Sequence, residues 1–267
     1  MKTSNPTFPE FAFQIVALLV SAILVHAVYV TAIRPAAADE IESVRIAMAE
    51  DSNFEPKRSL VVVVRDFEQE ACFILMLWAM AIMGYKGIGV IRARRSIPED
   101  LIPVGEGMRI LPEDARNLQR ELAGLPARVR QSLVPRALTA ALHRFDSARN
   151  IQDVSDAAHA ICESEGERLE SELSMIRYIA WAIPSIGFIG TVRGIGQALS
   201  RAHKAVEGDI SGVTESLGVA FNSTLIALMI SIVVMFLVHQ LQLAQERYVL
   251  DARAYCEEHL IRRLHTG

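Results

Sequence analysis

Apolar residues gather into four blocks along the chain, and each block is long enough to cross a lipid bilayer as a helix. The blocks run from Phe11 to Ile33, Ala71 to Ile91, Tyr178 to Ser200 and Leu217 to His239. A helix of about 21 to 23 residues is roughly 32 to 35 Å long, which is enough for the hydrocarbon core of a membrane. The pattern therefore predicts an all-α integral membrane protein with four transmembrane helices.

The first block has a second interpretation, a secretory signal, because the small residues Ala36, Ala37 and Ala38 follow it like a cleavage site. The apolar core of such a signal is usually about 7 to 15 residues long and is preceded by several basic residues. This block is longer, and only Lys2 precedes it. We therefore expect an uncleaved helix.

Basic residues near the ends of the blocks set the expected orientation, since they favour the cytoplasmic side. The second block is followed by Arg92, Arg94 and Arg95, and the fourth by Arg247 and Arg253. These flanks place both termini in the cytoplasm, although Arg201 and Lys204 then lie outside. The expected organisation is a tail and first span at 1–33, an outer loop at 34–70, the second span at 71–91, a cytoplasmic helical region at 92–177, the third span at 178–200, an outer loop at 201–216, the fourth span at 217–239 and a cytoplasmic C-terminal helix at 240–267.

The segments between the blocks also carry helix signals. The VVVV run at 61–64 predicts a short amphipathic helix, with a small strand as the alternative, and residues 96–109 predict a loop. Helices are expected from Pro112 onward, with breaks at residues 124–126 and at Pro135. Apolar positions every three or four residues from Ile151, without a proline before Pro184, predict one helix over 151–200 that bends, if anywhere, at Gly166.

Two of the four blocks carry matching faces of small residues. In the third block, Ala180, Pro184, Gly187, Thr191, Gly194 and Ala198 recur at offsets of three and four. In the fourth, Ser216, Ala220, Ser223 with Thr224, Ala227 and Ser231 do the same, and Asn222 lies beside them. Such faces allow transmembrane helices to pack closely. The matched pair, each with a threonine in its middle third, also fits a lined pathway or a close-fitting partner helix.

Charged residues are scarce inside the blocks. Within the stated boundaries there is no aspartate or glutamate, so an ion carried through these helices needs a carboxylate from elsewhere. Arg193 lies on a face with Gly190, Gln197 and Arg201, where an interfacial anchor or a hydrogen bond between subunits is favoured over a selectivity charge. His26 is expected to be a hydrogen-bonded packing residue, with a proton relay as the alternative.

Several functional classes find no support. The net charge of −4, without a basic tract, gives no sign of nucleic-acid binding. The three cysteines show no CxxC spacing, and therefore indicate neither a disulfide framework nor a zinc site. No span combines a nucleophile with a base or carries an HExxH motif, so we expect neither an enzyme nor a bound metal or cofactor.

The motif IPSIGFIGTVRGI, which begins at Ile183, resembles the proline and GxxGTVxG sequence of the MotA/TolQ/ExbB proton-channel superfamily. The segment LGVAFNSTLIALMISI at 217–232 is similar to the last core helix of that family. Departures are Val219, where TolQ-like and ExbB-like members often have glutamate, Asn222, where many relatives have a polar or acidic residue, and Ala227, where glycine is common. The layout of four spans is more like the flagellar stator subunit, whereas the motif is more like the TolQ and ExbB branch.

The resemblance implies a subunit of an ion-driven motor in the bacterial inner membrane. In such a motor, five copies surround the single transmembrane helices of two MotB/TolR/ExbD-like partner subunits, and each partner brings an aspartate. The implied ion pathway is formed by Thr191, Thr224, Ser223 and Asn222, and the implied pore-face packing by Pro184, Gly187, Gly190, Gly194, Ala220 and Ala227. The expected ion is the proton, with sodium as an alternative because of the hydroxyl pair Ser223–Thr224. A membrane scaffold that recruits partners through its cytoplasmic helices, without ion flow, is the competing hypothesis.

Overall fold

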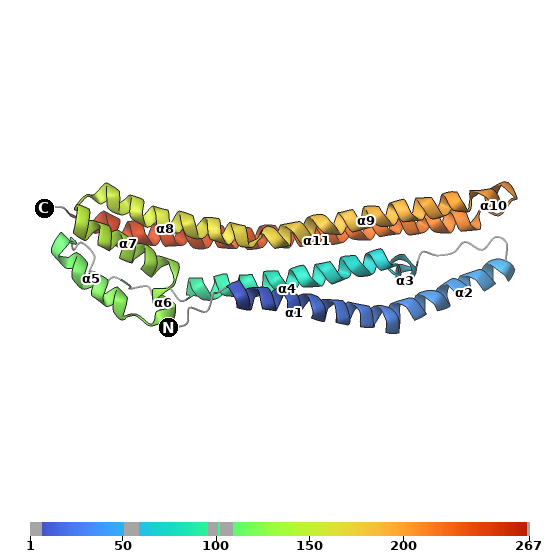
Figure 1. The fold of residues 1–267 in the computed structure, drawn as a ribbon, viewed down its shortest axis with the longest axis horizontal. Helices are drawn as coiled ribbons and strands as arrows, with labels where there is room; N and C mark the ends of the chain where they lie inside the picture. Colours follow the sequence, from blue (N-terminus) through green and yellow to red (C-terminus); the bar gives the residue numbers. More distant parts are fainter. Residues whose placement is uncertain (1–6, 51–58, 96–100, 102–108, 266–267) are drawn as a thin grey trace. The chain divides into compact units, whose positions relative to one another are not determined.

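The computed structural model describes residues 7–50, 59–95, 101 and 109–265, and helices account for all the regular elements within them. An isolated bridge joins Ile110 to Leu264. The elements, labelled in Figure 1, are α1 (Thr7–Val28), the π-helix η1 (Tyr29–Ile33), α2 (Arg34–Glu50), α3 (Leu60–Val63), α4 (Phe67–Arg95), α5 (Pro112–Gly124), α6 (Ala127–Arg130), α7 (Leu133–Ala148), α8 (Ile151–Glu172), α9 (Ser174–Ser200), α10 (Ala202–Val206), α11 (Ser211–His259) and the 3₁₀-helix η2 (Ile261–Arg263).

Four helical stretches among the described residues are long and apolar enough to cross a membrane. They cover Glu10–Glu50, Phe67–Arg95, Ile151–Ser200 and Ser211–Arg263, and each contains one of the four predicted blocks. The prediction of an all-α protein with four membrane-spanning helices is confirmed. The chain divides into two compact units, here called unit 1 (Met1–Gly84 and Met175–Val238) and unit 2 (Tyr85–Ser174 and His239–Gly267).

In unit 1, the first span continues beyond its predicted end at Ile33 through a π-helical turn. Proline lacks a backbone N–H, and its ring excludes the carbonyl oxygen four residues before it, so Pro35 disfavours regular α-helix at this point. The chain widens into η1, where the N–H of Arg34 donates to the carbonyl of Tyr29 five residues earlier. The helix then resumes as α2, so the start of the expected outer loop is helical.

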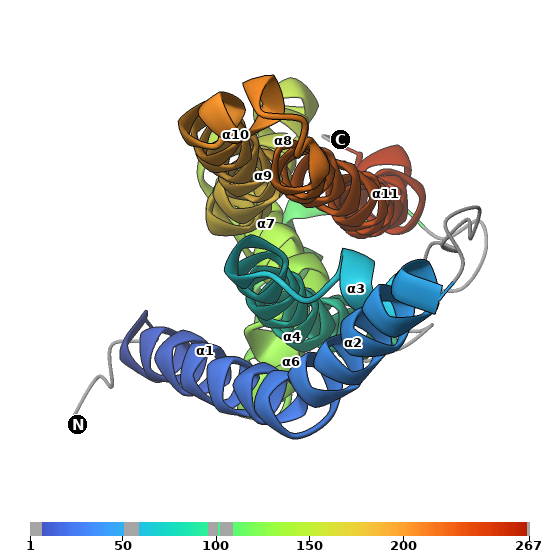
Figure 2. The ribbon, with the colours of Figure 1, turned by 90° about the vertical axis from the view of Figure 1, so that its right-hand side faces the viewer.

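Helices α9 and α11 lie side by side in unit 1, and the views of Figures 1 and 2 agree on this. Their backbones approach closely because glycines of α9 face small residues of α11. A Cβ atom added at Gly187 would lie 2.5 Å from the Cβ of Ala227, and one added at Gly194 would lie 2.8 Å from the carbonyl oxygen of Ser216. Real Cβ atoms do not come that close, so the contact requires glycine. The small faces seen in the sequence therefore pack α9 against α11.

The other faces of these two helices carry large exposed apolar side chains. Among them are Trp181, Val192 and Leu199 on α9 and Phe221 and Ile232 on α11, each more than 60% exposed. Apolar side chains that face outward along a whole helix are typical of a surface covered by lipid or by another apolar helix. Unit 1 therefore has large apolar side chains on its outer surface and small or polar side chains where its helices meet.

Unit 2 has a hydrophobic core of its own, formed by the facing sides of α5, α7, α8 and the C-terminal part of α11. Fully buried members include Leu138, Phe145, Val154 and Leu260. The predicted break at residues 124–126 is present, since α5 ends at Gly124 and α6 begins at Ala127. The break predicted at Pro135 lies too late in the sequence, since α6 ends at Arg130 and α7 begins at Leu133. This proline lies in the first turn of α7, where backbone N–H groups have no partner within the helix, so a proline costs nothing there.

The single helix predicted over 151–200 is interrupted, but at Leu173 and not at Gly166. The N–H of Leu173 donates to the carbonyl of Glu170, three residues earlier, which tightens one turn between α8 and α9. Gly166 remains helical. It faces α11, where an added Cβ would touch Val249 at 4.0 Å. The predicted loop at 96–109 lies largely outside the described residues.

The connection between α9 and α11 contains one glycine whose conformation matters. Gly208 has a φ of +100°, a value that L-residues with side chains rarely adopt, and it follows the short helix α10. Asp209 then starts α11 by accepting a hydrogen bond from the N–H of Ser211 at 3.0 Å, and the hydrogen bonds from Ser211 lower the pKa of the Asp209 carboxyl. α11 continues beyond the expected end of the fourth span, through to His259.

The α9–α11 contact yields a stability prediction with an internal control. Gly194→Ala is expected to destabilise the protein by about 1 to 3 kcal/mol, because the new methyl group forces two backbones apart. At Gly196, an added Cβ has no heavy atom within 4 Å, so Gly196→Ala is expected to be neutral or slightly stabilising through helix propensity. Thermal unfolding of the two detergent-solubilised variants measures the difference. Equal melting temperatures would contradict the close contact.

Candidate functional site

Two threonine hydroxyls meet where α9 and α11 are in contact. The Oγ1 atoms of Thr191 and Thr224 lie within hydrogen-bonding distance of each other. Each also lies 3.2 Å from the carbonyl oxygen of Gly187, and Thr191 Oγ1 lies 3.3 Å from the carbonyl oxygen of Ala220. Four oxygen atoms from two helices therefore gather at one point. Both threonines are partly buried, so this oxygen cluster, as we call these four atoms, lies at the edge of the contact.

The oxygen cluster has spare capacity to accept hydrogen bonds or to bind a cation. Two hydroxyls supply two protons, whereas the four oxygens together carry more lone pairs than two protons occupy. Hard oxygen ligands of this kind suit a proton donor or a small cation such as Na⁺. No aspartate or glutamate occurs in residues 174–200 or 216–245. A negative charge at the cluster must therefore come from another helix or another chain.

Pro184 creates an unsatisfied carbonyl that α11 satisfies. In a regular helix, the N–H of residue 184 would donate to the carbonyl of Ala180, but proline has no N–H. The hydroxyl of Ser231, on α11, donates to that carbonyl at 3.2 Å. Pro184 itself is partly buried within α9. The proline of the motif is thus compensated by a serine from the small face of α11, and this hydrogen bond joins the two helices about two turns before Gly187.

The remaining predicted site residues are five small residues at the helix contact and the polar residues Ser223 and Asn222. Gly187, Gly190, Gly194, Ala220 and Ala227 are buried where α9 meets α11. Ser223 is also buried, with its hydroxyl donating to the carbonyl of Val219 at 2.9 Å. Asn222 is partly buried beside them. The structure therefore brings Thr191 and Thr224 together, whereas Ser223 faces a different neighbour, described next.

Sequence reasoning missed a buried polar segment at the start of α4. The second span was expected to begin at Ala71, but α4 begins at Phe67, and Glu68, Gln69 and Glu70 in its first turn are at most 9% exposed. Gln69 Nε2 donates to the carbonyl of Val63 at 3.1 Å and lies 3.4 Å from the hydroxyl of Ser223. An aspartate followed by acids in the next turn is a helix-start signal. Asp66 and the two glutamates would have given the earlier boundary.

The two glutamates pair with basic residues whose partners the sequence did not identify. His26 Nδ1 lies 2.7 Å from Glu70 Oε1, and the guanidinium of Arg34 binds the other oxygen of the same carboxylate. Arg193 lies 2.7 Å from Glu68. His26 is therefore hydrogen-bonded, and Arg193 is held by α4. Both carboxylates belong to a helix that also carries a span, although they lie before the apolar block itself.

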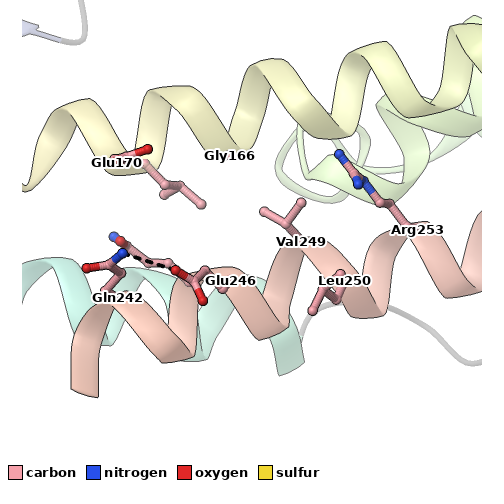
Figure 3. A pocket seen from close by; sticks show the side chains of 9 residues that line it. Gly166, Glu170, Gln242, Glu246, Val249, Leu250 and Arg253 are labelled. Atoms are coloured by element: carbon pink, nitrogen blue, oxygen red, sulfur yellow. Dashed lines mark hydrogen bonds between the residues drawn. The ribbon is translucent and has the colours of Figure 1, made fainter. Parts of the chain in front are cut away.

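A cavity of about 380 Å³ lies in unit 2 between α8 and α11, away from these residues. Gly166 leaves room on α8, and Val249 and Arg253 of α11 point into the gap, as Figure 3 shows. On its α11 side, Gln242 Nε2 donates to Glu246 Oε1 at 3.1 Å. Among the described residues no group of three or more His, Cys, Asp or Glu side chains is placed to hold a metal ion.

Part of the chain matches a known protein family. Residues 129–253 match the model of the MotA/TolQ/ExbB proton channel family, which confirms the resemblance inferred from the two motifs. The matched region is slightly less than half of the chain. It contains α7, α8, α9 and most of α11, and so includes the oxygen cluster, whereas α1 to α5 lie outside it. No curated protein and no solved structure matches the chain.

The Pro184–Ser231 arrangement predicts a measurable coupling between two substitutions. Ser231→Ala is expected to cost about 0.5 to 1.5 kcal/mol, because it leaves the carbonyl of Ala180 without a donor. In a Pro184→Ala background the restored N–H takes over that carbonyl, so the same serine substitution is expected to cost close to zero. Thermal unfolding of the two single variants and the double variant gives the coupling energy. Additive effects would show that the serine does not compensate the proline.

Proposed function

We propose that this chain, a membrane protein whose residues 129–253 match the MotA/TolQ/ExbB proton channel family, is the channel-forming subunit of an ion-driven motor. The observation that carries the proposal is the oxygen cluster of Thr191 and Thr224 between two apolar, membrane-length helices. Ions move along this cluster, and their movement produces rotation or force in a partner subunit.

The charge distribution supports a partner that supplies a carboxylate. A bare cation in an apolar helix bundle is costly unless a negative group binds it during transit. The parts of α9 and α11 around the oxygen cluster contain no acidic residue. In the proposed complex, five copies of the chain surround two single-span partner subunits, and an aspartate of each partner reaches the level of Thr191 and Thr224.

The exposed apolar faces of unit 1 support an assembly within the membrane. Phe188, Val192 and Leu199 on α9 are more than half exposed, as are Phe221 and Ile232 on α11, so these helices have large surfaces left for neighbouring copies and lipid. In the topology we propose, both termini and unit 2 lie in the cytoplasm, and the start of α4 lies on the outer side of the bacterial inner membrane.

The energy available to such a motor is adequate. One elementary charge that crosses a potential of 100 mV releases about 2.3 kcal/mol, so a few ions supply enough free energy for a conformational step. Protons are the proposed ion because a carboxylate and two hydroxyls are sufficient to transfer them. Sodium is the alternative, since the four oxygens of the cluster are also suitable ligands for it.

Replacing both threonines tests the proposal. The Thr191→Ala/Thr224→Ala variant is expected to assemble normally but to lose ion uptake by at least about tenfold, which corresponds to about 1.4 kcal/mol of lost stabilisation for the ion or carboxylate. Thr191→Ser/Thr224→Ser keeps both hydroxyls and is expected to retain most of the uptake. Proton and sodium uptake are measured in vesicles that contain the chain co-expressed with its neighbouring reading frame, and native mass spectrometry of the same complex gives its subunit composition.

Ser185→Ala is the matched control. Its hydroxyl lies on the same helix but bonds only locally, to the carbonyl of Trp181 at 3.1 Å. It is expected to leave uptake unchanged. Normal uptake by the double alanine variant would exclude the oxygen cluster from the pathway. A monomer or dimer without a single-span partner would favour the scaffold instead, in which the cytoplasmic helices recruit proteins without ion flow.

A further inference from the structure

Arg193 and Glu68 form an ion pair between α9 and α4. Arg193 Nη2 lies 2.7 Å from Glu68 Oε2, and Arg193 Nε lies 2.7 Å from Glu68 Oε1. The Glu68 side chain is only 10% exposed, and that of Arg193 is 36% exposed. Nη2 donates a charge-assisted hydrogen bond to Oε2, whereas Nε approaches Oε1 without donating to it. Arg193 lies within the region matched to the channel family, whereas Glu68 lies outside it.

The pair touches the same turn of the helix contact that carries the oxygen cluster. A Cβ added at Gly190 would lie 3.2 Å from Glu68 Cγ and 2.5 Å from Ser223 Cβ. Arg193 follows Thr191 by two residues, which is about 3 Å along the helix axis. Residues two apart project from nearly opposite sides of a helix, so the guanidinium does not touch the cluster. Because Glu68 lies against Gly190, the residue before Thr191, the ion pair stands at the edge of the same helix contact, where its charge acts on an ion at the cluster through space.

Asp66 is a second, more distant acidic neighbour of Arg193. Asp66 Oδ1 lies 3.9 Å from Arg193 Nη2, whereas Glu68 Oε2 lies 2.7 Å from the same atom. The neighbouring ionic contacts engage other residues; they are Arg65 with Glu215, Arg201 with Glu215, and Glu70 with Arg34 and His26. Glu68 is thus the carboxylate in direct contact with the guanidinium.

We propose that Glu68 sets the rate at which cations pass along the ion pathway, because it neutralises a guanidinium that would otherwise repel cations at Thr191 and Thr224. The inference rests on the proposed channel function. At an effective dielectric constant of about 20, a bare positive charge about 10 Å from a passing cation changes the rate of passage by about tenfold. Pairing with Glu68 removes most of that barrier.

A purely structural role for the ion pair gives a different set of results. If the pair only fastens α4 to α9, removing either partner disrupts the same contact, and both single variants lower ion uptake to a similar extent. If Glu68 acts through charge, the two variants have opposite effects. Glu68→Gln leaves Arg193 with the longer contact to Asp66 at 3.9 Å and therefore makes the potential beside the pathway more positive, whereas Arg193→Gln makes it more negative.

The test compares wild type, Glu68→Gln, Arg193→Gln and the double variant, each as the complex co-expressed with the neighbouring reading frame. Proton uptake into vesicles is followed with a pH-sensitive dye, and sodium uptake with ²²Na⁺. We expect Glu68→Gln to lower uptake about tenfold, Arg193→Gln to raise it, and the double variant to recover most of the loss. Equal losses in both single variants, or an unchanged Glu68→Gln, would overturn the proposal.

Two further variants keep the test decisive. If Glu68→Gln does not assemble, Arg193→Glu carries the test, since an added negative charge is expected to raise cation uptake and a fall would contradict the proposal. Arg65→Gln/Glu215→Gln removes another ion pair of the same unit, whose side chains are 22% and 58% exposed, and serves as the control. Absence of uptake by the wild-type complex overturns the channel function itself. Uptake that depends on Thr191 and Thr224 but falls equally in both single variants overturns only the role of Glu68.

Discussion

Steric exclusion between α9 and α11 is the constraint on which the arrangement of unit 1 depends. Gly187, Gly190 and Gly194 recur along one face of α9, and a methyl group at any of them would come within 2.7 Å of a side chain on α11. Backbones that approach this closely place main-chain carbonyls of one helix within reach of side chains on the other. The carbonyl of Gly187 thereby accepts from Thr224, and that of Ala180 from Ser231. Small residues thus create the polar contacts as well as the packing.

These contacts explain why α9, which carries the IPSIGFIGTVRGI motif, tolerates residues that weaken helices. Glycine and proline both lower helix stability in water, and proline also leaves a carbonyl without a donor. In unit 1 each of these destabilising effects is offset by a specific contact with α11. The glycines admit α11, and the carbonyl that Pro184 leaves free is bonded by Ser231. In an apolar surrounding such a carbonyl has no water to bond, so it needs a donor such as the hydroxyl of Ser231.

The sequence was informative where a pattern has one physical meaning. Long apolar blocks gave the four spanning helices, and the period of three and four gave the small faces that meet. It misplaced the break at Pro135, because a proline in the first turn of a helix resembles one that ends it. It missed Glu68 and Glu70 because a span was defined by hydropathy, and charged residues in its first turn were assigned to the loop. The partners of His26 and Arg193 lie 44 and 125 residues away, and no local pattern identifies contacts at that separation.

At two distant positions of the sequence, a buried charged side chain is paired with an opposite charge. Lys86, whose side chain is 4% exposed, binds Glu172 at 2.9 Å in unit 2, just as Arg193 binds Glu68 in unit 1. A charge removed from water is costly unless an opposite charge with good geometry offsets it. In unit 1 the pair stands at the edge of the helix contact that carries the oxygen cluster. If the chain conducts cations as proposed, a buried carboxylate that satisfies a structural requirement also sets the electrostatic potential that a passing cation encounters.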